Sequence, residues 1–298
     1  MLSDVTAELV DQPLVDALVS LLDIEQLEEN LFQGVSPETS LQRVFGGQVA
    51  GQALVAAGRT APADRHVHSL HAYFIRPGDP SVPILYTVDR ARDGRSFSVR
   101  RVVAVQHGEA IFTLSASFQL AQPGFEHGSA MPDVVPPESL PALPELLATH
   151  PKPPMVLLSL PNPIDIRYVD GPPWQTQRPS SHHRLWIKVK GRLPDDPLLH
   201  VCAATFASDF NLLEAVLVRH GLGWERNRVA SASLDHAMWF HRPFRADDWL
   251  LYDTWSPSAS GGRGLAQGSM YTRDGSHALT VLQEGMLRCP PDTAAAGG

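Results

Sequence analysis

The sequence has few of the features that mark secreted, membrane-spanning or metal-stabilised proteins. Only two cysteines, Cys202 and Cys289, occur among 298 residues, and they form no CxxC motif. We therefore expect neither a disulfide framework nor a zinc knuckle. The chain has no run of eighteen apolar residues and no basic-then-apolar leader at Met1, which argues against a membrane span and against secretion. These absences predict a cytoplasmic protein.

Basic residues are also in the minority. The 24 lysines and arginines against 32 aspartates and glutamates give a formal net charge of −8, so no nucleic-acid partner is expected. With 43% apolar and 19% charged residues, the composition is typical of a soluble globular protein. A chain of this length can form two domains that each bury a core of their own.

One phrase occurs twice in the chain. The stretch SLHAYFIRP at 69–77 returns at 233–243 as SLDHAMWFHRP, which matches at both ends with two extra residues inside. A turn pair that ends in Gly108 follows the first copy, and one that ends in Gly275 follows the second. Each turn lies between two strand-like runs, as in a hairpin. The repeat is too long for a solenoid unit, so it predicts one small domain that was duplicated and fused.

The pattern of apolar residues predicts similar elements in both halves. In the first half we expect a helix at 13–29, a strand at 31–35, a buried helix at 46–57, and strands at 67–75, 84–89, 96–105 and 110–118. In the second half we expect a strand at 183–189, a helical stretch at 197–220 that breaks at 208–209, and strands at 230–240, 249–255, 263–271 and 278–287. The helices follow from a 3.6-residue apolar period, and the strands from alternation or from β-branched and aromatic runs.

The two halves are separated by a proline-rich region. Prolines are dense in residues 121–179, where we expect only a short helix at 143–149 and a strand at 164–169. We predict an N-terminal domain at 1–120, a proline-rich linker at 121–160 and a C-terminal domain at 161–298. Each domain is α+β, with a central helix wrapped by an antiparallel sheet. Two such copies can join their sheets edge to edge, which hides two exposed edges.

This layout and its local phrases resemble acyl-CoA thioesterase II, a double hotdog fold. The phrases are RVFGGQVAGQAL at 43–54, HAYFIRPGD at 71–79, RDGRSF at 92–97, SDF at 208–210, HAMWFHRP at 236–243 and QEG at 283–285. They occur in the same order and span nearly the whole chain outside its termini and the linker. The resemblance implies hydrolysis of acyl-CoA thioesters to free acid and CoA, without a metal or an organic cofactor. We also expect a homo-oligomer, either a dimer or a tetramer.

The resemblance further implies three catalytic residues in the second half. They match Asp209 in the helical region, Ser233 on a following strand and Gln283 on the last strand; the family often has Thr where this chain has Ser233. A thioester carbonyl is attacked readily by a water that is held and partly deprotonated. Asp209 can accept the proton of that water as a general base, while the hydroxyl and the amide hold the water in line.

Six further residues are candidates for substrate binding. The glycines at 46 and 47 let a ligand approach the backbone at the start of a helix, where N–H groups can stabilise an oxyanion. Arginines bind phosphate bidentately and are candidates for contacts with CoA. The six residues are Gly46, Gly47, Gln48, Arg95, Arg101 and Arg263.

Each candidate also has a purely structural interpretation. Asp209 could cap a helix, Ser233 could be a strand hydroxyl that bonds the backbone, Gln283 could be an exposed strand residue, and the arginines could be solvated. The first half offers an internal comparison. Alignment on the hairpin glycines places Ala116 opposite Gln283, alignment on the repeated phrase places Ser69 opposite Ser233, and no acidic residue occurs at 46–62. The comparison predicts one active site per chain.

Other functions remain open at this stage. A hotdog enoyl-CoA hydratase needs a histidine a few residues after the aspartate, and none follows Asp209. A non-enzymatic acyl-CoA binding or sensor protein has no need of the three catalytic residues. His66, His68 and His71 resemble a metal set, but His71 faces opposite to the other two on a strand. No G-x-S-x-G nucleophile elbow occurs.

Overall fold

The computed structural model describes residues 2–37, 43–149, 162–175, 178–223 and 229–288. The strands of the first half are β1 (Glu25–Glu28), β2 (Leu31–Gly34), β3 (Arg65–Phe74), β4 (Ile84–Asp93), β5 (Phe97–Gln106) and β6 (Glu109–Leu120). Those of the second half are β7 (Ile164–Tyr168), β8 (His183–Val189), β9 (Ala230–Ser233), β10 (Asp235–Phe240), β11 (Leu250–Ser260), β12 (Arg263–Thr272) and β13 (His277–Arg288). The helices are α1 (Leu2–Leu22), α2 (Gly46–Thr60), α3 (Leu143–Ala148), α5 (Pro197–Ser208) and α6 (Glu214–Arg219), with a 3₁₀ turn η1 at Pro137–Ser139.

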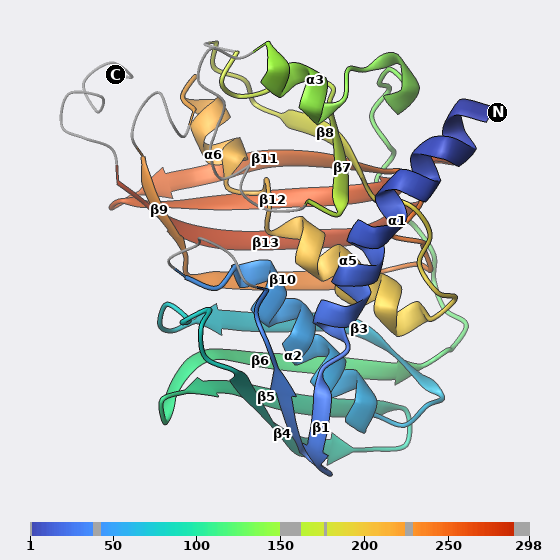
Figure 1. The fold of residues 1–298 in the computed structure, drawn as a ribbon, viewed down its shortest axis with the longest axis vertical. Helices are drawn as coiled ribbons and strands as arrows, with labels where there is room; N and C mark the ends of the chain where they lie inside the picture. Colours follow the sequence, from blue (N-terminus) through green and yellow to red (C-terminus); the bar gives the residue numbers. More distant parts are fainter. Residues whose placement is uncertain (1, 38–42, 150–161, 176–177, 224–228, 289–298) are drawn as a thin grey trace.

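One continuous antiparallel sheet runs through both halves. Its order is β1-β2-β4-β5-β6-β3-β10-β13-β12-β11-β8-β7, and β9 pairs with β13. Figure 1 shows α1, α2 and α5 on one face of this sheet, with α2 crossing the first half and α5 the second. A central helix wrapped by an antiparallel sheet in each half, with the two sheets joined at their edges, is therefore confirmed. The division at residues 120 and 160 stays a prediction, and the linker is described only up to residue 149.

The two halves meet where β3 pairs with β10. The pairing is antiparallel, and its register matches Ser69 with Trp239, His71 with Ala237 and Tyr73 with Asp235. Because the repeat makes His71 and Ala237 equivalent, each copy uses the same residues to contact the other. This is the isologous pattern of a two-fold dimer interface, built here within a single chain.

The register corrects the alignment of the two repeated phrases. Phe118 and Gly285 lie at the same distance after the hairpin glycines of their halves, and they pair with Val67 and Ser233 respectively. Ser233 therefore corresponds to Val67, and not to Ser69. In this register the two copies align without an insertion. The Ser-Leu at the start of each phrase is therefore a coincidental match. The first half thus keeps no counterpart of the Ser233 hydroxyl.

One predicted helix differs from the sequence-based expectation, and another breaks where it was expected to break. The helix expected at 13–29 ends at Leu22, and residues 25–28 form strand β1 against β2 instead. All four side chains of β1 are exposed, so this segment has no apolar face that a helix could bury. The helical stretch at 197–220 divides into α5 and α6 near the expected break at 208–209.

The two central helices pack closely and run antiparallel. Three glycines of α2 face α5: a Cβ on Gly47 would lie 2.4 Å from the carbonyl oxygen of Phe206, one on Gly51 would lie 3.4 Å from that of Cys202, and one on Gly58 would lie 2.4 Å from Leu198 Cδ2. At Gly47 an added Cβ would overlap a backbone atom of α5, so no larger residue fits at that position. The packing brings the first turn of α2 against the last turn of α5.

We expect Gly47→Ala to lower the free energy of unfolding by about 1–3 kcal/mol, because the added methyl group meets backbone atoms of α5 that cannot move aside. Urea denaturation followed by circular dichroism measures the change. Gly124→Ala in the linker is the matched control, since a Cβ there would meet no atom within 4 Å. An equal stability of the two variants would contradict close packing at Gly47.

Candidate active site

Three of the predicted residues meet at the junction of the halves. Gln283, in the middle of β13, donates from Nε2 to Asp209 Oδ1 at 2.6 Å and to Ser233 Oγ at 2.8 Å. The Ser233 hydroxyl at the end of β9 lies 3.5 Å from the same carboxylate oxygen. Gln283 is fully buried, and the other two are partly buried. One amide group therefore links a carboxylate and a hydroxyl from three separate elements.

Asp209 is placed by the end of one helix and the beginning of another. It is the C-cap residue of α5, with backbone angles φ −80° and ψ −10°, and it does not cap the start of α6, whose N-cap is Leu213. Its carboxylate instead accepts a hydrogen bond from the backbone N–H of Gly47, in the first turn of α2. A Cβ on Gly46 would lie 2.7 Å from Asp209 Oδ2. A carboxylate of the second half thus lies at the positive end of the helix of the first half.

Burial changes the acidity of this carboxylate. Removal from water raises the pKa of Asp209 to about 6, against the hydrogen bonds from Gln283, Gly47 and Ser233, which lower it. A base with a pKa just below neutral is largely ionised at pH 7 and accepts a proton more readily than an ordinary aspartate. Such a shift in a cluster of polar groups is typical of functional sites.

A buried polar network holds the turn that follows Asp209. Asn211 Nδ2 donates to Tyr168 Oη at 3.2 Å and to Glu214 Oε2 at 2.9 Å, and His183 Nε2 lies 3.2 Å from the same Glu214 oxygen. All four side chains are buried. These contacts fix the turn between α5 and α6, and they were not identified from the sequence. The only signal was a run of polar residues within an otherwise apolar helical stretch.

A buried histidine lies beside the cluster. His236 on β10 contacts Ser208 Oγ through Nε2 at 2.9 Å, and burial lowers the pKa of its imidazole to about 4. It is therefore neutral at physiological pH. Its Nδ1 and Gln283 Oε1 are buried without a hydrogen-bond partner in the part of the chain that the structure describes.

The predicted substrate-binding residues are not all brought to this site. Gly46 and Gly47 touch Asp209, whereas the Gln48 side chain donates to Val35 O at 3.3 Å and to Ser36 Oγ at 3.0 Å. The N–H of Gly47 already binds the carboxylate, and that of Gln48 donates to Phe45 O at 3.2 Å. Both of these backbone donors, predicted to stabilise an oxyanion, thus have partners within the protein.

The three predicted arginines lie away from the carboxylate. Arg101 is exposed between the buried Arg100 and Val102, so it faces the side of the sheet that the helices do not cover. Arg263 pairs with Glu284 at 3.0 Å, and the exposed Arg95 lies between β4 and β5. The structure does not bring these side chains to Asp209, and a contact with CoA phosphates stays a prediction.

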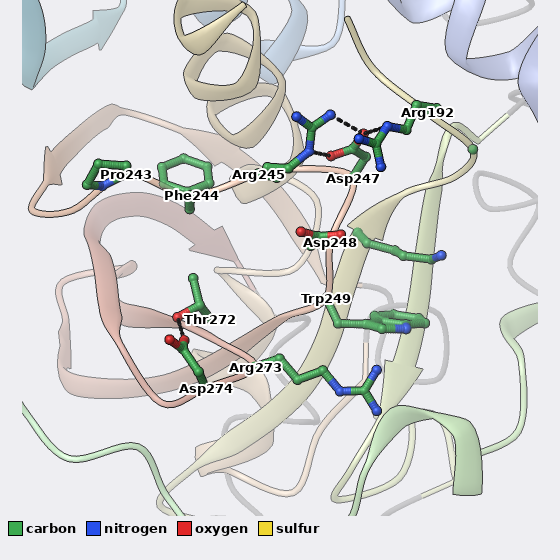
Figure 2. Close-up of a pocket in the computed structure, with 12 residues that line it drawn as sticks. Arg192, Pro243, Phe244, Arg245, Asp247, Asp248, Trp249, Thr272, Arg273 and Asp274 are labelled. Atoms are coloured by element: carbon green, nitrogen blue, oxygen red, sulfur yellow. Dashed lines mark hydrogen bonds and ion pairs between the residues drawn. The ribbon is translucent and has the colours of Figure 1, made fainter. Parts of the chain in front are cut away.

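A cavity of about 740 Å³ lies in the second half, away from the cluster of Asp209, Ser233 and Gln283. Its lining comes from the end of β8, the segment before β11 and the end of β12. Figure 2 shows Arg245 and Arg192 against Asp247, whereas Asp274 lies against Thr272. Arg245 Nε binds Asp247 Oδ1 at 2.9 Å, with Arg192 4.0 Å from Oδ2. None of the three clustered residues lines it.

The absence of metal sites and membrane spans was also predicted, and the described residues bear on both points. They contain no group of three histidine, cysteine or acidic side chains that could hold a metal. Within the same ranges, no helix is long and apolar enough to cross a membrane. Cys202 is buried as a free thiol, and Cys289 lies outside the described residues.

Comparisons with known proteins match both halves of the chain to acyl-CoA thioesterases. The sequence model of the acyl-CoA thioesterase family matches residues 169–286, and that of the acyl-CoA thioesterase N-terminal domain matches residues 35–119. Acyl-coenzyme A thioesterase 8 of Homo sapiens is 42% identical over 290 residues, which cover 93% of this chain and 90% of the relative. Acyl-CoA thioesterase 2 of Haemophilus influenzae is 38% identical over 281 residues, which cover 92% of this chain and 98% of the relative.

Solved structures show the same fold. An acyl-CoA thioesterase II from Mycobacterium marinum superposes with a TM-score of 0.76 and 45% identity, and the match covers 92% of this chain and 98% of that one. A hotdog-fold protein from Alicyclobacillus acidocaldarius, at 21% identity, has a TM-score of 0.75 and supports the fold alone. With this fold, and with close identity to these relatives over most of its length, the chain belongs to the acyl-CoA thioesterase family.

Proposed function

We propose that the protein hydrolyses acyl-CoA thioesters to a free acid and CoA, through a water activated by Asp209 at one site per chain. The observation that carries this proposal is the hydrogen-bonded cluster of Asp209, Ser233 and Gln283 at the start of α2. Ala116 and Val67 stand at the corresponding places of the first half, so a second site of this kind has neither the amide nor the hydroxyl.

The chemistry requires one proton acceptor and two positioning groups. Asp209 takes a proton from water while the water oxygen attacks the thioester carbonyl carbon. The tetrahedral intermediate then collapses, the C–S bond breaks, and the thiolate of CoA takes up the proton. Ser233 Oγ and the unpaired Oε1 of Gln283 can each hydrogen-bond the attacking water, which fixes its approach. The positive end of α2 favours the negative charge that develops beside it.

The rival functions receive less support. A hotdog hydratase would need a histidine paired with the aspartate, but His236 is neutral and bonds Ser208 instead. A protein that only binds acyl-CoA gains nothing from a carboxylate whose burial raises its pKa and therefore costs stability at neutral pH. Two sequence-based predictions stay predictions, namely the dimeric or tetrameric state and the cytoplasmic location.

We expect Asp209→Asn to lower kcat at least about a hundredfold, because the amide cannot accept the proton of the water. The substitution should not lower the free energy of unfolding. The folded-state pKa of Asp209 lies above its unfolded value, so the ionised group destabilises the fold above pH 6 and this cost disappears as the pH falls toward 4. The Asn variant should therefore be as stable at pH 8 as the wild type, or more stable by about 1–3 kcal/mol. Thiol release from acyl-CoA and urea denaturation measure the two effects, and near-normal turnover would show that Asp209 is not the base.

The pH dependence of turnover gives a separate test. Since the base must be ionised, kcat/KM should be halved near pH 6 and fall about tenfold for each further unit of acid. Rates measured from pH 4.5 to 8 with a pH-independent thiol readout would reveal this limb. A profile that stays flat down to pH 5 would contradict the raised pKa of the catalytic carboxylate.

The hydroxyl should matter for turnover more than for binding. Ser233→Ala should lower kcat about 10- to 100-fold with little change in KM, because the group positions water and not the substrate. Ser233→Thr keeps the hydroxyl and should stay within a few-fold of the wild type. Ser69→Ala is the control, since Ser69 does not correspond to Ser233. Steady-state kinetics of the three variants decide the matter; a loss confined to KM would argue against the water-positioning role.

A further inference from the structure

A β-bulge places His236 beside Gln283 in the sheet. Between the registers of β9 and β10, the three residues 234–236 lie opposite only two residues of β13. The extra residue bends the strand and re-aims the side chains next to it, a feature that is frequent beside active sites. His236 and Gln283 are both buried on the face that the helices cover. They contact consecutive residues at the end of α5, Ser208 and Asp209 respectively.

The hydrogen bonds of His236 determine which ring nitrogen carries the proton. Ser208 Oγ lies 2.9 Å from the carbonyl oxygen of Thr205 and 2.9 Å from His236 Nε2. The hydroxyl can donate to the carbonyl and accept from Nε2–H, whereas the reverse arrangement would bury Nδ1–H without an acceptor, and buried donors without partners are rare. Because burial lowers the pKa of this imidazole to about 4, the ring carries one proton at neutral pH. Nδ1 is therefore a lone-pair acceptor.

His236 Nδ1 and Gln283 Oε1 are thus two buried acceptors on neighbouring strands. Neither has a hydrogen-bond partner in the part of the chain that the structure describes. Opposed residues on paired strands have Cβ atoms about 5 Å apart, and one water can donate a hydrogen to each of two acceptors at such a separation. An amide oxygen has two lone pairs, so Oε1 can accept from this water and from the attacking water together.

We propose that His236 is a positioning residue for the hydrolysis, because its Nδ1 and Gln283 Oε1 share one buried water that fixes the Gln283 amide. The proposal rests on the proposed thioesterase function. With its oxygen held in this way, the amide directs its NH₂ group toward Asp209 and Ser233, the direction in which it lies in the structure. An amide turned by half a rotation would place its oxygen against the carboxylate, where neither group can donate. His236 acts through Gln283 and not on the reacting atoms.

Two substitutions separate the roles of the two ring nitrogens. The δ atoms of Asn lie as far along the side chain as Nδ1, whereas the ε atoms of Gln reach as far as Nε2. His236→Asn therefore keeps an acceptor for the water, and His236→Gln keeps only a contact with Ser208. In thiol-release kinetics, His236→Gln should lower kcat about 10- to 100-fold with little change in KM, and His236→Asn should stay within about fivefold of the wild type. A role confined to holding Ser208 predicts the opposite order, which would overturn the proposal.

The pH profile gives a readout that a loss of stability alone would not move. The hydrogen bond from Gln283 lowers the pKa of Asp209, so release of the amide should raise that pKa. Tyr252, which also acts on this carboxylate, stays neutral because burial raises its own pKa. The acid limb of kcat/KM should therefore move to higher pH in His236→Gln and stay in place in His236→Asn. An acid limb that moves equally in both variants would contradict the assignment to Nδ1.

His200→Gln is the matched control. His200 is also a buried histidine with a pKa lowered by burial and with one nitrogen that has no partner among the described residues. It lies near the start of α5, beside Asp247, and not in the catalytic cluster. His200→Gln should lower the free energy of unfolding in urea and leave both kcat and the acid limb where they are in the wild type. A fall in kcat equal to that of His236→Gln would show a general effect of a lost buried imidazole.

NMR of histidine labelled with nitrogen-15 tests the tautomer without turnover. With His236→Asn to assign the signal, we expect the wild type to carry the proton on Nε2 and to have Nδ1 unprotonated at neutral pH. A protonated Nδ1 would overturn the shared water, whatever the activity. Hydrolysis by the wild type with normal turnover in His236→Gln would overturn this inference and leave the thioesterase function intact. No hydrolysis of any acyl-CoA by the wild type would overturn the proposed function instead.

Discussion

The close antiparallel packing of α2 on α5 determines most of what lies around the candidate site. Glycines at 47, 51 and 58 let the two helices approach until their backbones touch. Because the helices run in opposite directions, the first turn of one meets the last turn of the other. Asp209, at the end of α5, thereby reaches the N–H groups and the positive dipole end of α2. The site is thus made at the contact between the two halves, and neither half contains it alone.

Burial of the carboxylate has both a cost and a use. Removing Asp209 from water disfavours its charge, whereas hydrogen bonds from Gln283, Ser233 and Gly47 hold it ionised near neutral pH. The balance leaves a carboxylate with a pKa of about 6, which in our proposal is the base and is ionised at neutral pH. The hydrogen bond from Asn211 to Glu214 holds the turn that follows Asp209.

The duplication has given the two halves different tasks. In our proposal the second half supplies the reacting groups, and the first half supplies the helix end against which they lie. Pairing of β3 with β10 keeps these parts in fixed register. The positions of Ser233 and Gln283 are occupied in the first half by Val67 and Ala116, apolar residues that pack against the first-half core. Apolar residues at these positions leave no buried polar side-chain atoms that would need partners.

The sequence by itself determined the repeat, the α+β class, most strands and the break between α5 and α6, because these follow from local apolar periods and from turn residues. The resemblance to acyl-CoA thioesterase II predicted Asp209, Ser233 and Gln283 as catalytic residues from the sequence. Only the tertiary structure decided that β1 is a strand, that Ser233 matches Val67 and that Arg101 faces away from the helices. Strand register and the facing of side chains depend on partners far along the chain, and the contact between Asp209 and Gly47 exists only because α5 packs on α2.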